Sequence, residues 1–228
     1  MKCIFAILSS VFIVLGIFVS PGESAIITLN PAVDTYVDWG ENAIAHGSNG
    51  ELSVGTYYTN LKNRARRILM NFDLSGVPDE VEITSAELSL YAYSDNKTGN
   101  YPVRIGGMKI PVTNSLTAND IYSTTWNTNH WGESSAIVGT GWKTWNLLET
   151  GEWDYATDLG DNSLDLYLKY ANETAFHDYT LFHSMEWDGG SPNYPVLSIE
   201  YAVPIPGAAL LLGSGLLCLF AVRRRVKG

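Results

Sequence analysis

The chain has 228 residues and a formal net charge of −10, because 24 acidic residues outnumber 14 lysines and arginines. This balance argues against nucleic acid as a partner, since phosphate binding requires clustered lysine and arginine. The two cysteines, Cys3 and Cys218, lie near the ends, so the middle of the chain can form no disulfide. Its length is enough for one domain with its own core between two apolar ends.

The first residues have the features of a secretory signal peptide. Lys2 provides a basic start, and a long apolar stretch runs from Ile4 to Val19. Gly22 and Ser24 are small residues of the kind that precede a cleavage site. We therefore expect a signal helix and signal peptide at residues 1–24, cleavage after Ser24, and export of the chain. An uncleaved membrane anchor is the alternative.

The last residues, 203–228, combine an apolar run with a basic tail. The run from Ala208 to Val222 is 15 residues long, or about 22 Å as a helix. A bilayer core is about 30 Å thick, so the run becomes a minimal span when the residues just before it are included. The arginines that follow it fit a cytoplasmic stop. The segment therefore predicts a C-terminal transmembrane helix that anchors the chain in a membrane.

The order of residues in this tail resembles the PEP-CTERM sorting signal, in the variant that begins Val-Pro-x-Pro-Gly. The residues that carry the resemblance are Pro204, Pro206, Gly207, Arg223, Arg224 and Arg225. Ile205 stands where the family name has glutamate. The resemblance implies an exosortase-type processing enzyme and delivery to the cell envelope, outer surface or extracellular matrix of a Gram-negative bacterium that makes exopolysaccharide. An ordinary tail anchor is the alternative.

Between these ends, residues 25–202 consist of short runs in which apolar and polar residues alternate, separated by turn residues. The clearest run is Val81–Tyr93, where Leu88, Leu90 and Ala92 tend to one face and the residues between them to the other. Further strands are expected at residues 35–39, 52–57, 66–72, 101–112, 164–169, 179–185 and 197–201. The sequence therefore predicts an all-β domain, an antiparallel β-sandwich of jelly-roll type with roughly eight or more strands.

Four sequence blocks in this body resemble the DNRLRE domain, also called the disaggregatase-related repeat. They are Asp34–Val37, His46–Gly55, Arg66–Ser75 and Ile83–Tyr91, and the family's closing pattern matches Phe182–Glu186 followed by Pro195–Leu197. Residues 113–161 match poorly. The family is grouped with carbohydrate-binding modules, and some members bind acidic polysaccharide such as alginate. The resemblance implies a β jelly roll that binds polysaccharide.

Aromatic residues gather in one stretch, because five of the seven tryptophans lie between Trp126 and Trp153. Sugar rings present flat C–H faces that stack on aromatic side chains, while amide and imidazole groups bind their hydroxyls. Loops on a rigid sandwich are common places for binding residues. The predicted ligand-binding residues are Trp126, Asn127, Asn129, His130 and Trp131. Burial in the core is the alternative for the tryptophans, and it is favoured for Trp142 or Trp145.

Calcium is a candidate cofactor, because carboxylates flank the first strand and follow a late strand that could lie beside it. The four carboxylates are Asp34, Asp38, Glu186 and Asp188. The alternatives are turn capping by the aspartates and an ion pair of Glu186 with Arg66 or Arg67. The histidines lack zinc spacing and no nucleophile motif is present, so we expect no catalysis. A polysaccharide lyase or glycosidase is the less favoured alternative.

Together these features predict an exported, non-catalytic carbohydrate-binding protein that interacts with the exopolysaccharide of a biofilm matrix. A structural or adhesion protein that binds protein partners is the alternative. The nine basic and 23 acidic residues of the body give it a formal charge of −14. An anionic polymer would be repelled at low salt unless calcium or a local basic patch, Arg64, Arg66 and Arg67, offset this charge. We therefore expect a neutral glycan or calcium-dependent binding.

Overall fold

The computed structural model describes residues 23–39, 50–59, 62–96, 101–113, 116, 129–134, 139–173, 178–189 and 193–203. The chain divides into a large compact unit, Ile26–Tyr201, and a unit formed by its two ends. The predicted signal helix and transmembrane helix fall largely on residues 1–22 and 204–228, outside the described part. Within the described ranges, no helix is long and apolar enough to cross a membrane.

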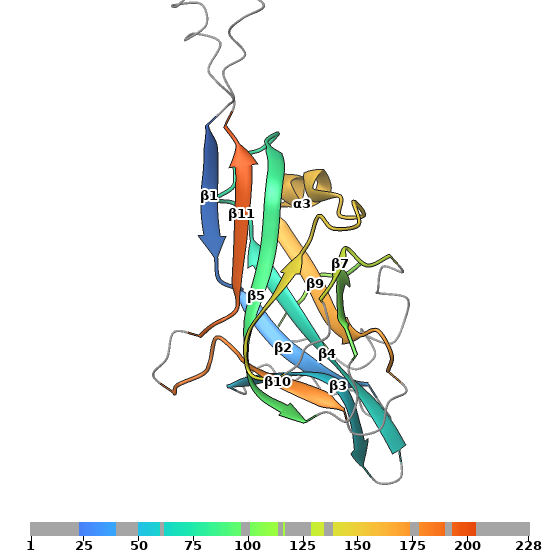
Figure 1. The fold of residues 1–228 in the computed structure, drawn as a ribbon. Helices are drawn as coiled ribbons and strands as arrows, with labels where there is room; N and C mark the ends of the chain where they lie inside the picture. Colours follow the sequence, from blue (N-terminus) through green and yellow to red (C-terminus); the bar gives the residue numbers. More distant parts are fainter. Residues whose placement is uncertain are drawn as a thin grey trace, which may run out of the picture. The chain divides into compact units, whose positions relative to one another are not determined.

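The described residues form eleven strands and one short helix (Figure 1). The helix is α3 (Tyr155–Asp161), which lies between β8 and β9 in the sequence. The strands are β1 (Ser24–Leu29), β2 (Val33–Trp39), β3 (Glu51–Thr59), β4 (Lys62–Asp73), β5 (Glu82–Asn96), β6 (Val103–Gly107), β7 (Gly132–Glu133), β8 (Gly141–Asn146), β9 (Ser163–Tyr170), β10 (Tyr179–His183) and β11 (Val196–Ala202).

The strands join into one network in the order β1-β11-β5-β10-β3-β4-β9-β6-β7, with β2 beside β4 and β8 beside β5. The ladders with a defined register are antiparallel. Figure 1 shows how strongly the sheet curls: the long strand β5 lies beside β11 and bends away towards β10. The predicted all-β antiparallel fold is confirmed.

The main core lies on one face of the long strands. In β5, Leu88, Leu90 and Ala92 are buried, and the side chains between them point to the other face, as the period of two in a strand requires. Leu166 and Leu168 of β9 belong to the same core. This alternation fixes which side chains of β5 lie on the outer face, where they are exposed or partly exposed.

Candidate functional site

The loop that we expected to bind sugar lies only partly within the described residues. Trp126 and Asn127 fall outside them. Asn129 is exposed, and its Nδ2 donates a hydrogen bond to Glu152 Oε2 at 2.7 Å. His130 is half-buried, and its carbonyl oxygen accepts a hydrogen bond from Thr150 Oγ1 at 2.8 Å. The role of these four residues in sugar binding stays a prediction.

Trp131 lies in the core, so of the two possibilities for this residue, ligand contact and burial, the structure shows burial. Its side chain is 5% exposed, and its ring packs against Trp153 with the centroids 5.8 Å apart. The cause is the pairing of this backbone segment with β6. The Trp131 N–H donates a hydrogen bond to the carbonyl oxygen of Ile105 at 2.8 Å, and the next residue, Gly132, stands opposite Ile105 in the ladder. The backbone thus docks on β6 and the indole is buried, whatever the polarity of its sequence neighbours.

An aromatic surface lies instead on the outer face of β5 and its neighbours, and consists of Tyr91, Tyr93, Trp142, His183 and Trp187. Tyr91 and Tyr93 occupy the outward positions of β5. Trp142 of β8 stands opposite Tyr91 in the ladder, and the two rings meet edge to face at a centroid distance of 5.6 Å. Trp142 is 49% exposed. It therefore offers its ring to a ligand, while its neighbour Trp145 is the one that fills the core.

His183 and Trp187 complete the aromatic surface, in which Trp187 is half-buried and His183 is buried. His183 ends β10, and its ring stacks on Trp187 with a centroid distance of 4.1 Å and an interplanar angle of 8°. The His183 ring also lies 5.3 Å from the ring of Tyr91 and 5.0 Å from that of Tyr93. Burial lowers the pKa of His183 below its ordinary value, so the imidazole is neutral at pH 7. The surface is therefore aromatic and uncharged at its centre.

Hydroxyl groups border these rings. The Tyr93 hydroxyl donates to Glu51 Oε2 at 2.7 Å, and burial, followed by this contact with Glu51, raises the pKa of Tyr93. Ser89 and Thr144 face each other across the β5–β8 ladder with their hydroxyl oxygens 3.3 Å apart. Aromatic faces beside hydroxyl and carboxylate groups are the two kinds of contact that a sugar ring needs.

A second aromatic cluster surrounds Arg66 of β4. The guanidinium carbon lies 4.5 Å from the ring centroid of Tyr57, 5.3 Å from that of Tyr36 and 5.9 Å from that of Tyr179. Tyr179 begins β10, the strand that ends at His183, so this strand connects the cluster to the aromatic surface.

Two of the three arginines predicted to form a basic patch contact carboxylates. Arg66 Nε donates to Asp38 Oδ1 at 2.8 Å, and Arg67 makes two hydrogen bonds with Glu173, at 2.7 and 2.6 Å. The expected ion pair of either arginine with Glu186 is therefore replaced by these two pairs. The charges of Arg66 and Arg67 are thus offset within the protein, whereas Arg64 Nε is buried without a hydrogen-bond partner in the described part of the chain.

The four carboxylates considered for calcium do not form one cluster. Asp38 binds Arg66, whereas Asp34 accepts a hydrogen bond from the Met185 N–H. In the part of the chain that the structure describes, no group of three or more histidine, cysteine, aspartate or glutamate side chains is placed to hold a metal ion. A calcium site built from all four is therefore wrong.

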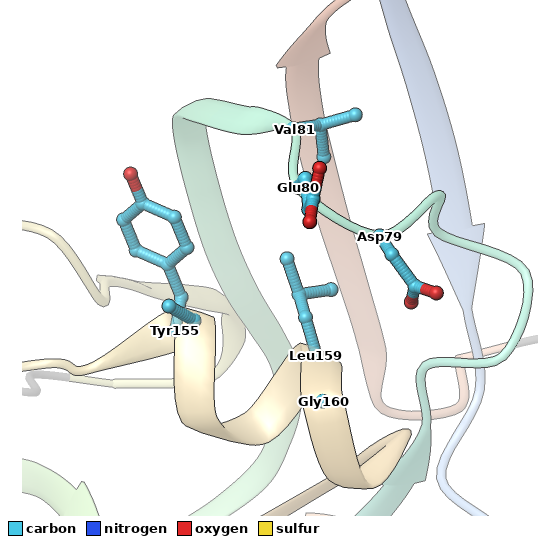
Figure 2. A pocket seen from close by; sticks show the side chains of 7 residues that line it. Asp79, Glu80, Val81, Tyr155, Leu159 and Gly160 are labelled. Carbon is cyan, nitrogen blue, oxygen red and sulfur yellow. The ribbon is translucent and has the colours of Figure 1, made fainter.

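A separate cavity of about 280 Å³ lies beside α3. Figure 2 shows Tyr155 and Leu159 of the helix on one side and Glu80 and Val81, which precede β5, on the other. Asp79 also lines the cavity. An aromatic ring near two carboxylates makes this cavity the alternative place for a sugar, and it can be tested separately from the aromatic surface.

The model of carbohydrate-binding module family 96 matches residues 25–153, which is more than half of the chain. No curated protein matches the chain. The matched range contains Tyr91, Tyr93 and Trp142, whereas His183 and Trp187 follow it. The predicted likeness to a carbohydrate-binding module is confirmed, and such a family indicates a binding module rather than a catalytic domain. The chain belongs to carbohydrate-binding module family 96.

Proposed function

We propose that the chain is a non-catalytic protein that binds a neutral polysaccharide through its aromatic surface. Family membership supports carbohydrate binding, and the observation that carries the site is the packed array of aromatic rings on this outer face, in which Trp142 is half exposed and Tyr91, Tyr93 and Trp187 are partly exposed. Binding sites of this kind combine apolar planes with a few placed polar groups. The antiparallel strands of a jelly roll would hold the rings rigidly, so little ordering is needed when the ligand binds.

The first prediction is that a neutral polysaccharide retards the full chain in affinity electrophoresis, in the presence of a chelator. Trp142→Ala should weaken this binding at least about tenfold, because it removes the most exposed ring of the aromatic surface. Tyr155→Ala is the matched control, since Tyr155 is a partly exposed aromatic residue that lines the cavity beside α3.

Comparison of sugar binding by the two variants shows whether the sugar binds at the aromatic surface or in the cavity beside α3. Loss of binding in Tyr155→Ala alone would place the sugar in the cavity and contradict the proposal. Unretarded migration of the wild type across a broad panel of polysaccharides would count against sugar binding and favour a protein partner. Retention of an anionic polymer in chelator at low salt would contradict the neutral ligand, because the body is strongly acidic.

We further propose that the chain is exported to the envelope of a Gram-negative bacterium, where it binds exopolysaccharide of the biofilm matrix. Residues 1–24 serve as the signal peptide, 25–202 as the binding domain and 203–228 as the sorting segment that an exosortase-type enzyme processes. Two apolar ends around a body without cysteine support this proposal. We expect the mature protein to begin at Ala25 and to occur in the envelope or the medium. N-terminal sequencing of fractionated cells checks this, and an intact chain in the cytosol would contradict it.

A further inference from the structure

Three cross-strand pairs lie in a row on the outer face of the ladder between β5 and β8. The outward positions of β8 are exposed, and they stand opposite the outward positions of β5. The pairs, in order, are Tyr91 with Trp142, Ser89 with Thr144, and Glu87 with Asn146. Successive pairs are two residues apart on each strand, so the row spans about 14 Å. This row, which we call the β5–β8 track, is longer than one sugar ring.

The chemistry of the track changes along its length. Tyr91 and Trp142 at one end present aromatic rings, which meet edge to face. The hydroxyl oxygens of Ser89 and Thr144 follow, 3.3 Å apart. The other end carries the carboxylate–amide pair, whose two members are exposed. The track therefore begins with a plane for stacking and ends with groups for hydrogen bonding, which is the combination that a ligand site needs.

The turn after β8 fixes the amide of Asn146. Its Oδ1 accepts a hydrogen bond from the Leu148 N–H at 2.9 Å. Because a backbone N–H can only donate, the acceptor is the amide oxygen, and the Nδ2 group is left to donate. The carboxylate of Glu87, opposite Asn146 in the ladder, offers only acceptors. A donor beside an acceptor matches two neighbouring hydroxyl groups of a sugar, one of which accepts from Asn146 while the other donates to Glu87.

The spacing of these groups requires a chain of sugars. A ring stacked on Trp142 leaves the carboxylate–amide pair about 14 Å away along the strand, so the hydroxyls that reach this pair belong to another sugar of the same chain. β5 also continues past the track, and the residues two positions beyond its ends, Ser85 and Tyr93, are partly exposed. Nothing in β5 therefore stops the chain at either end. A negatively charged sugar at the far end would be repelled by Glu87.

We propose that the β5–β8 track binds an internal stretch of a linear neutral glycan, with one ring stacked on Trp142 and hydroxyls of a nearby sugar bound by Glu87 and Asn146. This inference rests on the proposed function and names the substrate class of that site. The aromatic rings supply affinity, whereas Glu87 and Asn146 require unsubstituted hydroxyls at a defined place along the chain. Both strands belong to one ladder, so these groups are in register before the glycan binds.

The first test measures the affinity of the full chain as a function of glycan length. Glucomannan, mixed-linkage β-glucan and pullulan are the probes, and the one that retards the chain most is hydrolysed to oligosaccharides from the monosaccharide to the hexasaccharide. By isothermal titration calorimetry we expect affinity to rise at least about tenfold between the monosaccharide and the tetrasaccharide. Chemical reduction of the chain end should leave the affinity for the hexasaccharide unchanged. Equal affinity for the monosaccharide, or loss of binding on reduction, would overturn the proposal.

The second test changes the two groups at the far end of the track. Glu87→Ala and Asn146→Asp should each weaken hexasaccharide binding at least about tenfold, because each loses one hydrogen-bonding group of the site. Asn146→Asp keeps an acceptor for the Leu148 N–H and exchanges only the Nδ2 donor. Glu82→Ala is the matched control and should bind like the wild type, since Glu82 is an exposed glutamate of β5 outside the ladder with β8. Urea denaturation checks that all three variants fold.

Comparison with Trp142→Ala separates this inference from the function on which it rests. Weaker binding in Trp142→Ala, Glu87→Ala and Asn146→Asp, with Glu82→Ala unchanged, supports the track. Loss of binding in Trp142→Ala together with wild-type affinity in Glu87→Ala and Asn146→Asp would leave sugar binding at the aromatic surface and overturn the track. Full binding by Trp142→Ala, or no binding of any probe by the wild type, would overturn both.

Discussion

Replacement of Trp131 by alanine is expected to lower the free energy of unfolding by about 3–5 kcal/mol. The indole is buried in the main core against Trp153, and its removal would leave a cavity that the surrounding strands cannot fill. The strands cannot move together to close this cavity, because the backbone beside it is already tightly packed. A Cβ added at Gly132 would overlap the carbonyl oxygen of Asn146. Urea denaturation of the purified body, followed by fluorescence, measures the loss.

Trp142→Ala is the matched control for this experiment, because it removes the same side chain from a position that is 49% exposed. Its free energy of unfolding should change by less than about 1 kcal/mol, although sugar binding falls. The opposite ranking of the two variants would mean that Trp131 is the exposed ring and Trp142 the buried one. That result would restore the site predicted from the sequence.

The strands that could be predicted from the sequence are those with one face buried in the core and the other exposed to solvent. In β5 and β9, leucines alternate with polar or aromatic residues. The sequence therefore indicates directly both that these segments are strands and which of their side chains face the core. The strands β1, β7 and β8 were missed, as was the helix α3. β8 reads Gly-Trp-Lys-Thr-Trp-Asn, and its two tryptophans, three residues apart, point to opposite faces. Only the ladder with β5 shows which tryptophan is buried.

The predicted site failed at Trp131 for the same physical reason. Polarity of neighbouring residues indicates that a segment lies near the surface, but the direction of one side chain depends on the strand to which its backbone is bonded. Tyr91 and Tyr93 did carry a usable signal, since they are aromatic residues at outward positions of a predicted strand. Their partners Trp142 and His183 come from strands far away in the sequence, and no periodicity reveals which strands will pair.

A substitution at Gly55 should have an effect as large as that at Trp131, because this residue lies where β3 leaves β10 and joins β4. Gly55 is paired with Tyr179 on one strand and Arg66 on the other. Its φ is +133°, and a Cβ would lie 2.2 Å from the carbonyl oxygen of Asp178. That oxygen accepts the Thr56 N–H, so it cannot move without breaking a backbone hydrogen bond.

Gly55→Ala should therefore lower the free energy of unfolding by about 2–6 kcal/mol, from backbone strain and overpacking of about 1–3 kcal/mol each. Gly139→Ala is the control, because Gly139 has a φ of +68° but nothing within 4 Å of the added Cβ. It should cost only the strain, about 1–2 kcal/mol. Equal losses in urea denaturation would mean that β3 and β10 are not in close contact at Gly55. A larger loss at Gly55, accompanied by weaker sugar binding, would show that this strand crossing also holds Tyr179 and Arg66 in place beside the aromatic surface.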